Sequence, residues 1–394
     1  MNAKRSLFLV VLFVTPLLWG CGAMQKRTSL PAELSPVARV TESSDTIRFW
    51  GDERPVFTDE WLKLTRAEIR ARYPALKGTA HNYLALSGGA ADGAFGAGLL
   101  AGWTAKGDRP EFSLVTGIST GALIAPFAFL GSDYDAQLKE VYTTTSTKDI
   151  LTKVSALGQI ISTAAVGDPE PLKKLMAKYV DEKMLAALAT EHRKGRRLLV
   201  GTTNLDAGRP VIWNIGAIAA SGDSNALDLI RKVLLASASI PVAFPPVLIE
   251  VEANGSRYDE MHVDGGIVSQ VFLYPSGLDM HRVVEKFEVQ GPPHVYIIRN
   301  AAYDIGWKTV EPKLSSIAGR SVNTMTLNMG YGDLYRLYLE ANKSGIDYNL
   351  AYIPREFTLK AKEPFDREYM VKLFELGYSM GLSGYPWNKK PPGL

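Results

Sequence analysis

Short apolar runs alternate with longer stretches of helical periodicity along most of this chain. Four to six consecutive apolar residues between turn-forming residues are typical of buried strands, and apolar residues three and four apart are typical of helices. The pattern predicts strands at 83–86, 112–116, 198–203, 246–251 and 294–299. It predicts intervening helices at 93–105, 121–131, 171–189 and 225–237. This alternation indicates an α/β domain with a largely parallel sheet.

The two ends of the chain differ from this central pattern. Residues 314–344 and 366–382 have helical spacing, so we expect C-terminal helices packed on the sheet. A helix is also expected at 59–73. The residues before it are polar with little periodicity, so residues 21–58 are assigned to a tether and 59–394 to one domain. Residues 143–167 are a candidate lid segment.

The first twenty residues have the organisation of a secretory signal. The basic start M-N-A-K-R is followed by S-L-F-L-V-V-L-F-V-T-P-L-L-W-G and then by Cys21, the single cysteine. This run is shorter than a membrane-spanning helix requires, and Pro16 interrupts it. The segment resembles the lipobox of bacterial lipoproteins, although Trp19 stands where a small residue is usual. The resemblance implies cleavage after residue 20 and lipidation of Cys21; the alternatives are a plain signal peptide cut nearby and an uncleaved anchor with a free thiol. Gly22 in place of aspartate favours the outer membrane of a bacterial envelope, at its periplasmic face.

Composition narrows the possible functions. The chain of 394 residues has 44 Lys and Arg against 41 Asp and Glu, and removal of Lys4 and Arg5 with the signal leaves about +1. We therefore expect no nucleic-acid partner. One cysteine excludes an intramolecular disulfide. The five histidines are scattered without metal-ligand spacing, so no metal and no organic cofactor are expected.

The first candidate for chemistry is Gly117-Ile118-Ser119-Thr120-Gly121, between a predicted strand and a predicted helix. A serine on a tight strand-to-helix turn has its hydroxyl exposed above the sheet, and the glycines Gly117 and Gly121 allow the close packing of such a turn. The helix N-terminus adds positive partial charge. Ser119 is therefore a candidate nucleophile.

The second candidate is a glycine-rich loop, Ser87-Gly88-Gly89-Ala90-Ala91-Asp92-Gly93, which closes the first predicted strand. Free backbone N–H groups in such a loop bind an anionic oxygen. A nucleotide phosphate loop is disfavoured because no Gly-Lys-Ser/Thr follows and G-x-G-x-x-G is not met. An oxyanion hole for Ser119 is the better interpretation.

The third candidate is His262-Val263-Asp264-Gly265-Gly266. Asp264 offers a carboxylate base, but an ordinary aspartate with a pKa near ~4 is a poor base for a serine unless burial raises that pKa. Histidine commonly does this work, and His281 and His294 follow Asp264 in the chain order of an α/β-hydrolase triad. The residues alone thus leave a Ser–Asp pair and a Ser–Asp–His triad open.

The three motifs in this order resemble the patatin-like phospholipases over about residues 80–300. The segment A-S-A-S-I-P-V-A-F-P-P-V at 236–247 also resembles a stretch of that family. The resemblance implies a three-layer α/β fold with a central, largely parallel sheet and a lipid acyl hydrolase acting on (phospho)lipid esters. It implies Ser119 as nucleophile, Asp264 as base, and an oxyanion hole at Gly88, Gly89 and Ala90. Gly265 and Gly266 are the glycines of the base motif.

One loop departs from the family pattern. Ala90 replaces the third glycine, and Asp92 replaces a basic residue. The Ala90 N–H remains usable as a donor if φ at that residue is negative. A carboxylate in place of a cation favours an ester without a nearby phosphate. The altered loop is also the feature that would fit a non-catalytic envelope lipoprotein with the same fold.

Overall fold

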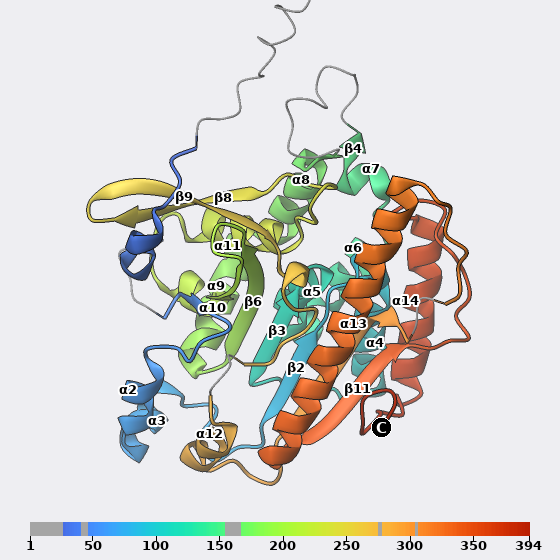
Figure 1. Cartoon of the computed structure of the whole chain (residues 1–394). Helices are drawn as coiled ribbons and strands as arrows, with labels where there is room; N and C mark the ends of the chain where they lie inside the picture. Colours follow the sequence, from blue (N-terminus) through green and yellow to red (C-terminus); the bar gives the residue numbers. More distant parts are fainter. Residues whose placement is uncertain (1–26, 41–45, 154–166, 275–277, 304–305) are drawn as a thin grey trace, which may run out of the picture.

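The structure, a computed structural model, describes residues 27–40, 46–153, 167–274, 278–303 and 306–394 (Figure 1). The predicted signal, Cys21 and residues 154–166 of the candidate lid segment lie outside the described residues. In the described part, no helix combines the length and apolar character needed to cross a bilayer.

A nine-stranded mixed sheet forms the centre of the molecule. Its main path runs through β1 (Arg48–Trp50), β7 (Arg209–Asn214), β6 (Arg197–Asn204), β3 (Leu114–Ile118), β2 (Asn82–Leu86), β10 (His294–Ala302) and β11 (Asp347–Ile353). The five strands from β6 to β11 are parallel to one another. β1 and β7 extend the sheet antiparallel. The hairpin of β8 (Val247–Ala253) and β9 (Ser256–Asp264) joins it through β6.

Strands β3 and β9 share one edge of β6. β3 pairs with the first part of β6 and ends where Ile118 faces Gly201. β9 runs antiparallel along the next three residues, and its last residue, Asp264, faces Thr202. Because Gly201 and Thr202 are consecutive, the end of β3 and the end of β9 meet at one point of the sheet.

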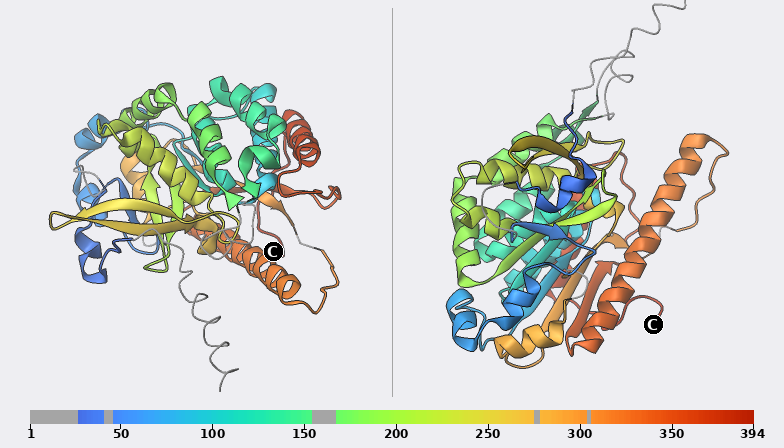
Figure 2. Two further views of the ribbon diagram at one scale, coloured as in Figure 1. Left: turned by 90° about the horizontal axis from the view of Figure 1, so that it is seen from above. Right: turned by 60° about the vertical axis from the view of Figure 1, so that its left-hand side comes forward.

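Helices cover both faces of the sheet, giving three layers (Figure 2). Alternate side chains of β2 show the division, since Leu84 and Leu86 pack in the larger core while Tyr83 and Ala85 pack in the smaller one. The larger core includes residues of α4 (Gly93–Lys106), α5 (Thr120–Leu130), α8 (Glu170–Tyr179), α9 (Glu182–Lys194), α10 (Ile215–Ala220), α11 (Ala226–Ser237) and α14 (Arg367–Leu382). The smaller core lies under α13 (Leu314–Lys343).

Shorter helices complete the described fold. They are η2 (Ala32–Val37), α2 (Thr58–Lys63), α3 (Arg66–Arg72), η3 (Ala90–Asp92), η4 (Ser132–Tyr134), α6 (Asp135–Thr144), α7 (Thr147–Ile150), η5 (Gly265–Ile267) and α12 (Met280–Phe287). A two-stranded sheet pairs β4 (Thr152–Lys153) with β5 (Gly167–Asp168).

The predicted fold class is confirmed, with differences in detail. All five predicted strands are present, although β3 starts two residues later than expected. Sequence periodicity missed four strands of the nine-stranded sheet, β1, β7, β9 and β11, and both strands of the small sheet, β4 and β5. The expected helix at 171–189 is two helices, α8 and α9, because Asp181 caps a new helix by accepting a hydrogen bond from the Met184 N–H.

The predicted tether is too long. Residues before 59 already belong to the domain, because β1 pairs with β7. Ser29 bridges to Asp259 and Arg39 bridges to Glu252, both on the β8–β9 hairpin. The segment lacks periodicity because it follows the outer surface of other elements, where few of its side chains are buried.

Candidate active site

Ser119 stands on the turn between β3 and α5, in a backbone conformation that non-glycine residues rarely adopt. Its φ is 55° and its ψ is −126°. The turn is held from below, where the Ser237 hydroxyl accepts the Ser119 N–H at 3.0 Å and donates to the Gly201 carbonyl at 2.7 Å. Strain of this kind is kept where surrounding contacts fix the geometry. Here the contacts present the serine side chain above the end of the sheet.

The two glycines of this motif are required by close backbone contacts. A Cβ on Gly117 would lie 2.4 Å from the Gly121 carbonyl oxygen, and a Cβ on Gly121 would lie 2.3 Å from the Leu86 carbonyl oxygen. Real Cβ atoms do not approach backbone that closely. Gly117 and Gly121 therefore let α5 start directly against the end of β2.

Asp264 is the last residue of β9 and is buried beside this turn. Its N–H donates to the Ser239 carbonyl at 3.0 Å, and its Oδ1 accepts the Gly266 N–H at 2.7 Å. Burial raises the pKa of its carboxyl to about 7, against smaller lowering effects of the Ser119 hydroxyl and the Gly266 N–H. Asp264 can therefore exchange a proton near neutral pH.

The two side chains are close but not joined by a hydrogen bond of normal geometry. The Ser119 hydroxyl is near enough to lower the pKa of Asp264. Asp264 Oδ2, however, is buried and has no hydrogen-bond partner among the described residues. We infer that the Ser119 hydroxyl and the Asp264 carboxyl lie close enough to form a hydrogen bond once substrate is bound, because catalytic hydrogen bonds commonly tighten only then. The free Oδ2 is the atom available to receive the serine proton.

The glycine-rich loop passes directly beside the serine. A Cβ on Gly88 would lie 3.3 Å from Ser119 Cβ. The Gly88 N–H is already donated to the Gln270 carbonyl at 3.1 Å. In the described structure, no hydrogen bond takes up the N–H of Gly89 or Ala90. Of the three predicted oxyanion donors, Gly89 and Ala90 are thus the two with a free N–H.

Ala90 does not have the negative φ expected of an alanine donor at this position. Its φ is +49°, not negative, so alanine occupies a left-handed position that glycine would adopt without strain. Its N–H nevertheless has no partner. Alanine in place of glycine at residue 90 therefore strains the backbone by about 1–2 kcal/mol, but it leaves the N–H available as a donor.

Asn300, which sequence reasoning missed, fixes the same loop. Its side-chain amide donates to the Ser87 carbonyl at 2.9 Å and its Oδ1 accepts the Gly96 N–H at 3.1 Å. Its carbonyl oxygen lies where a Cβ on Gly89 would be only 1.9 Å away. The one available signal was an asparagine ending the apolar run of β10.

Gln270 and Asp333, also missed, connect the two halves of the site. The Gln270 side-chain amide donates to the Gly266 carbonyl at 2.7 Å, and the backbone carbonyl of Gln270 accepts the Gly88 N–H. Asp333, on α13, accepts hydrogen bonds from the Gln270 N–H at 2.6 Å and the Ser269 hydroxyl at 3.0 Å. The base motif and the glycine loop are therefore held by one residue, which α13 secures in turn.

The triad alternative fails on geometry. His294 begins β10 at the end where the parallel strands start, paired with Asn82, whereas Ser119 follows the opposite end of β3. Its Nδ1 bonds Asp347 at 2.8 Å. His281 lies in the first turn of α12, which packs against α3 at that same far end (Figure 1). Neither histidine reaches Ser119.

His262 is nearer to Asp264 but is used elsewhere. Its ring bonds the Thr202 hydroxyl at 3.0 Å and Glu260 at 3.1 Å, and it is fully buried. Arg48 pairs with Glu260 on the far side. Desolvation lowers the pKa of His262, so a neutral ring is held in a structural network and has no bond to Asp264.

Asp92, which stands where the family pattern has a basic residue, lies at the start of α4 and is half-buried. Its Oδ1 accepts the Tyr369 hydroxyl at 2.6 Å. Burial raises the pKa of its carboxyl to about 6, with the tyrosine bond opposing. The carboxylate is thus anchored to α14, two residues from Ala90.

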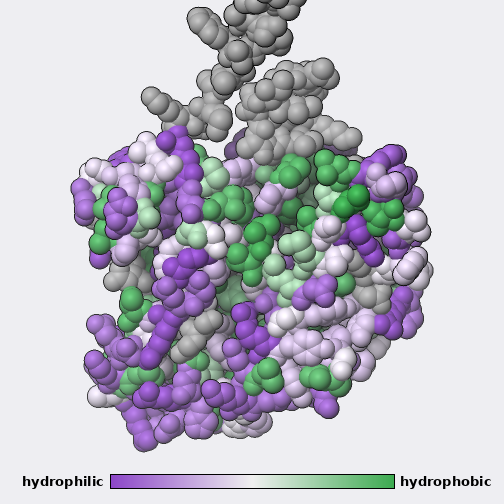
Figure 3. Space-filling model, in the orientation of Figure 1, coloured by the Kyte–Doolittle hydropathy of each residue, from purple (hydrophilic) through white to green (hydrophobic). Residues whose placement is uncertain are grey.

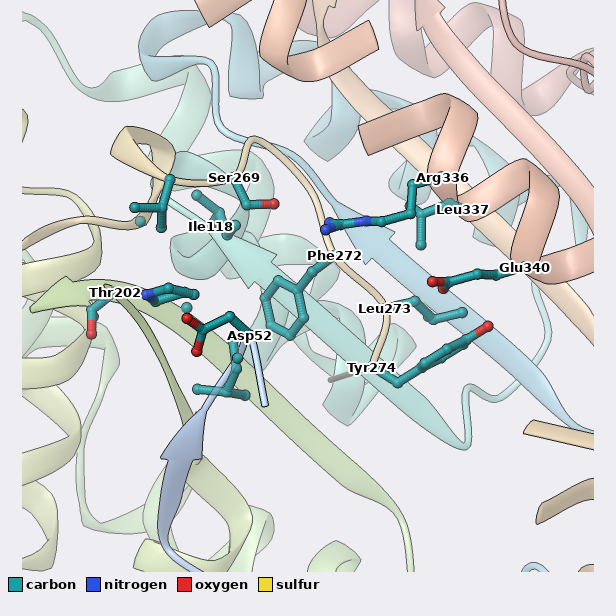
Figure 4. Close-up of a pocket in the computed structure, with 16 residues that line it drawn as sticks. Asp52, Ile118, Thr202, Ser269, Phe272, Leu273, Tyr274, Arg336, Leu337 and Glu340 are labelled. Carbon is teal, nitrogen blue, oxygen red and sulfur yellow. The ribbon is translucent and has the colours of Figure 1, made fainter. Parts of the chain in front are cut away.

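Two cavities are described beside the sheet, and the first reaches Ile118 and Gly265, the neighbours of Ser119 and Asp264 in the chain. One of about 200 Å³ opens between the base-motif loop and α13, where Ser269, Phe272, Arg336 and Glu340 surround it (Figure 4). A larger one of about 390 Å³ lies among aromatic residues at the opposite end of the sheet. Ser119 and Asp264 line neither, so neither is assigned to the reacting ester.

The candidate site combines a buried serine on a strained strand-to-helix turn, a buried carboxyl beside it and free N–H groups on an adjoining loop. These are elements that serine hydrolase sites share. The family model of the patatin-like phospholipases matches residues 84–275, which contain Ser119, Asp264 and the glycine loop. This part of the chain is therefore a patatin-like phospholipase domain, and its activity is that of a lipid acyl hydrolase.

Comparison with individual proteins adds little. No curated protein matches the chain. Among solved structures, VipD from Legionella pneumophila is similar at 14% sequence identity and a TM-score of 0.38, covering 77% of this chain and 67% of its own.

Proposed function

We propose that the chain is a lipid-anchored serine acyl hydrolase that uses a Ser119–Asp264 dyad. The supporting observation is the pairing along β6, where Ile118 faces Gly201 and Asp264 faces Thr202. This register brings the serine turn and the carboxyl together without a histidine.

The dyad suffices for a complete hydrolytic cycle. Asp264 Oδ2 takes the Ser119 proton as Oγ attacks the ester carbonyl carbon, and the oxyanion accepts hydrogen bonds from the Gly89 and Ala90 N–H groups. Collapse expels the alcohol, which receives the proton from Asp264, and leaves an acyl-serine. Asp264 then deprotonates a water molecule that attacks the acyl-serine. The fatty acid departs and Ser119 regains its proton.

The charge at Asp92 bears on the choice of substrate. A carboxylate two residues from Ala90 disfavours a phosphate close to the oxyanion loop. We therefore propose carboxylic esters of lipids as the substrate class, with neutral esters preferred over phospholipids.

The anchor is proposed from the lipobox-like sequence alone. Cys21 stands six residues before Arg27, the first described residue, so a lipid on Cys21 would hold the domain within about 20 Å of the bilayer. In a bacterial host, labelled palmitate should enter the wild-type protein and not Cys21→Ser. Equal labelling of both would remove the anchor from the proposal.

The catalytic proposal is tested by fatty-acid release from phospholipids, lysophospholipids and neutral esters, using the chain from Gly22 onward. A fluorophosphonate probe should label the protein, and peptide mapping should place the adduct on Ser119. Absence of turnover on every ester, with no adduct at Ser119, would refute the proposal.

The rate should depend on pH through the base. Because Asp264 acts as carboxylate and its pKa is raised to about 7, kcat/KM is expected to rise tenfold per pH unit below that value and to level off above it. Asp92→Asn should keep this limb, since Asp92 titrates nearer pH 6. A flat profile, or a limb that disappears in Asp92→Asn, would contradict Asp264 as the base.

Asp333→Ala should impair the site without touching substrate. Alanine removes the acceptor of the Ser269 hydroxyl and of the Gln270 N–H, so we expect kcat to fall about 10- to 100-fold with KM little changed. Arg336→Gln is the matched control, since Arg336 bonds the other oxygen of Asp333. Equal kcat in both variants would show that Asp333 has no positioning role.

A further inference from the structure

The first half of α13 extends beyond the protein core. Among the α13 residues whose exposure is described, none before Gly330 is buried, whereas Leu334, Leu337 and Ala341 pack on the sheet. At 1.5 Å per residue, the first sixteen residues span about 24 Å. Figures 1 and 2 show this half rising past the carboxyl ends of the strands.

The projecting half has an apolar side. Leu314, Ile317, Val322 and Met325 are 86%, 50%, 59% and 67% exposed. At 100° per residue, they fall within an arc of about 140°. Just before the helix, Trp307 is 99% exposed. We call these five residues the apolar arm.

An uncovered apolar side on a projecting helix requires a partner. Helices of this length are marginal in water, and their stability comes from burying an apolar face. Hydrophobic residues gather at this end of the molecule, around the N-terminal half of α13 (Figure 3). Exposed patches of this kind mark interaction surfaces.

The arm shares its end of the molecule with the active site. Ile240, Val242 and Ile267 are 37%, 73% and 44% exposed. Ile240 and Val242 follow Ser239, whose carbonyl accepts the Asp264 N–H, and Ile267 ends η5 directly after the base motif. Val242 has a φ of 74°, which is rare for a β-branched residue. Exposed apolar residues therefore also adjoin the segments that hold Asp264.

Charge and chain path favour a membrane as the partner. Lys308, Lys313 and Arg320 accompany the arm, with Glu311 as the one acidic residue between 306 and 325. Such a cationic balance attracts anionic lipids. Arg27 pairs with Asp206 and bonds Asp259 of the β8–β9 hairpin, at the same end (Figures 1 and 2).

We propose that the apolar arm inserts into the surface of a bilayer containing anionic lipids and presents ester bonds to Ser119. The inference rests on the proposed function for the reaction and on the arm's own exposure for binding. Aromatic and aliphatic residues on a helix with flanking cations are the usual elements of interfacial binding.

The test uses the chain from Gly22 onward, which retains every described element. An arm variant carries Trp307→Ser, Leu314→Ser, Ile317→Ser and Met325→Ser. The matched control carries serine at three exposed apolar positions away from the arm, Val56, Leu339 and Leu382. Sedimentation with vesicles, with and without phosphatidylglycerol, measures binding, and a dissolved short-chain ester measures the reaction.

Wild type and control should sediment with phosphatidylglycerol vesicles, and the arm variant should bind at least about tenfold more weakly. All three should hydrolyse the dissolved ester alike. Vesicle binding and ester hydrolysis are measured separately. Absence of ester turnover would therefore refute the proposed hydrolase function, while the binding result would still test the role of the apolar arm. Equal vesicle binding by the arm variant would overturn the inference.

Two further readouts identify the partner. The fluorescence of Trp307, taken as the difference between wild type and Trp307→Phe, should shift to the blue on adding vesicles. Lys308→Gln, Lys313→Gln and Arg320→Gln together should abolish the preference for phosphatidylglycerol. A wild-type dimer that the arm substitutions convert to monomer, with no vesicle binding, would assign the arm to a second copy of the chain instead.

Discussion

Replacing Ser119 with alanine is expected to lower kcat/KM for ester hydrolysis by about four orders of magnitude, because no other hydroxyl can form the acyl intermediate at this point. The turn itself should survive, since the Ser119 N–H bonds Ser237 whichever side chain is present. Initial rates on the preferred ester provide the measurement.

Ser132→Ala is the matched control, because Ser132 is an exposed serine on η4, away from the motifs. It should hydrolyse at the wild-type rate. Both variants should show unchanged thermal unfolding. Undiminished hydrolysis by Ser119→Ala would mean that another residue is the nucleophile.

Asp264→Asn should abolish ester hydrolysis and at the same time raise the free energy of unfolding. The amide cannot accept the serine proton, so we expect a loss of about three to four orders of magnitude in kcat/KM. Oδ1 of asparagine can still accept the Gly266 N–H, so the loop should be retained. Asp133→Asn, at an exposed position on η4, is the control.

The gain in stability should depend on pH. The pKa of Asp264 is about 7 in the folded chain and near ~4 when unfolded. Between these values the unfolded state loses a proton that the native state keeps, so the contribution of Asp264 to stability falls as pH rises and is fully lost above about 7. Melting temperatures should therefore favour Asp264→Asn more at pH 8 than at pH 5. A stabilisation independent of pH would contradict a buried charge at this position.

The motifs predicted which side chains lie together at the candidate site. To identify Ser119 within residues 117–121 as a candidate nucleophile, it was enough to predict a strand before the motif and a helix after it. Both can be predicted from the local sequence. The position of Asp264 beside Ser119 was predicted for a different reason, since the resemblance to a family, not periodicity, linked the two residues. From the residues alone, His281 and His294 remained open until the strand order placed them at the other end of the sheet.

The supporting residues could not be predicted because their partners are distant in sequence. Gln270 contacts Gly88 across 182 positions of chain, counted from the numbering, and Asp333 appears in the sequence as an ordinary polar residue of a long helix. β9 was missed since its outer part is half exposed and alternates charged residues. The arrangement that depends on them, two strands sharing one edge of β6, follows from pairing, not from local pattern.

The contacts between the first described residues and the β8–β9 hairpin determine how a pulling force would enter the domain. Any pull through the residues before Arg27 is first borne by its contacts with Asp206 and Asp259, and Asp259 lies in the strand that ends at Asp264. Tension on an anchor would thus load the hairpin before it reached the rest of the sheet. If Cys21 carries the proposed lipid, a force between membrane and domain would therefore act first on the strand that ends at Asp264.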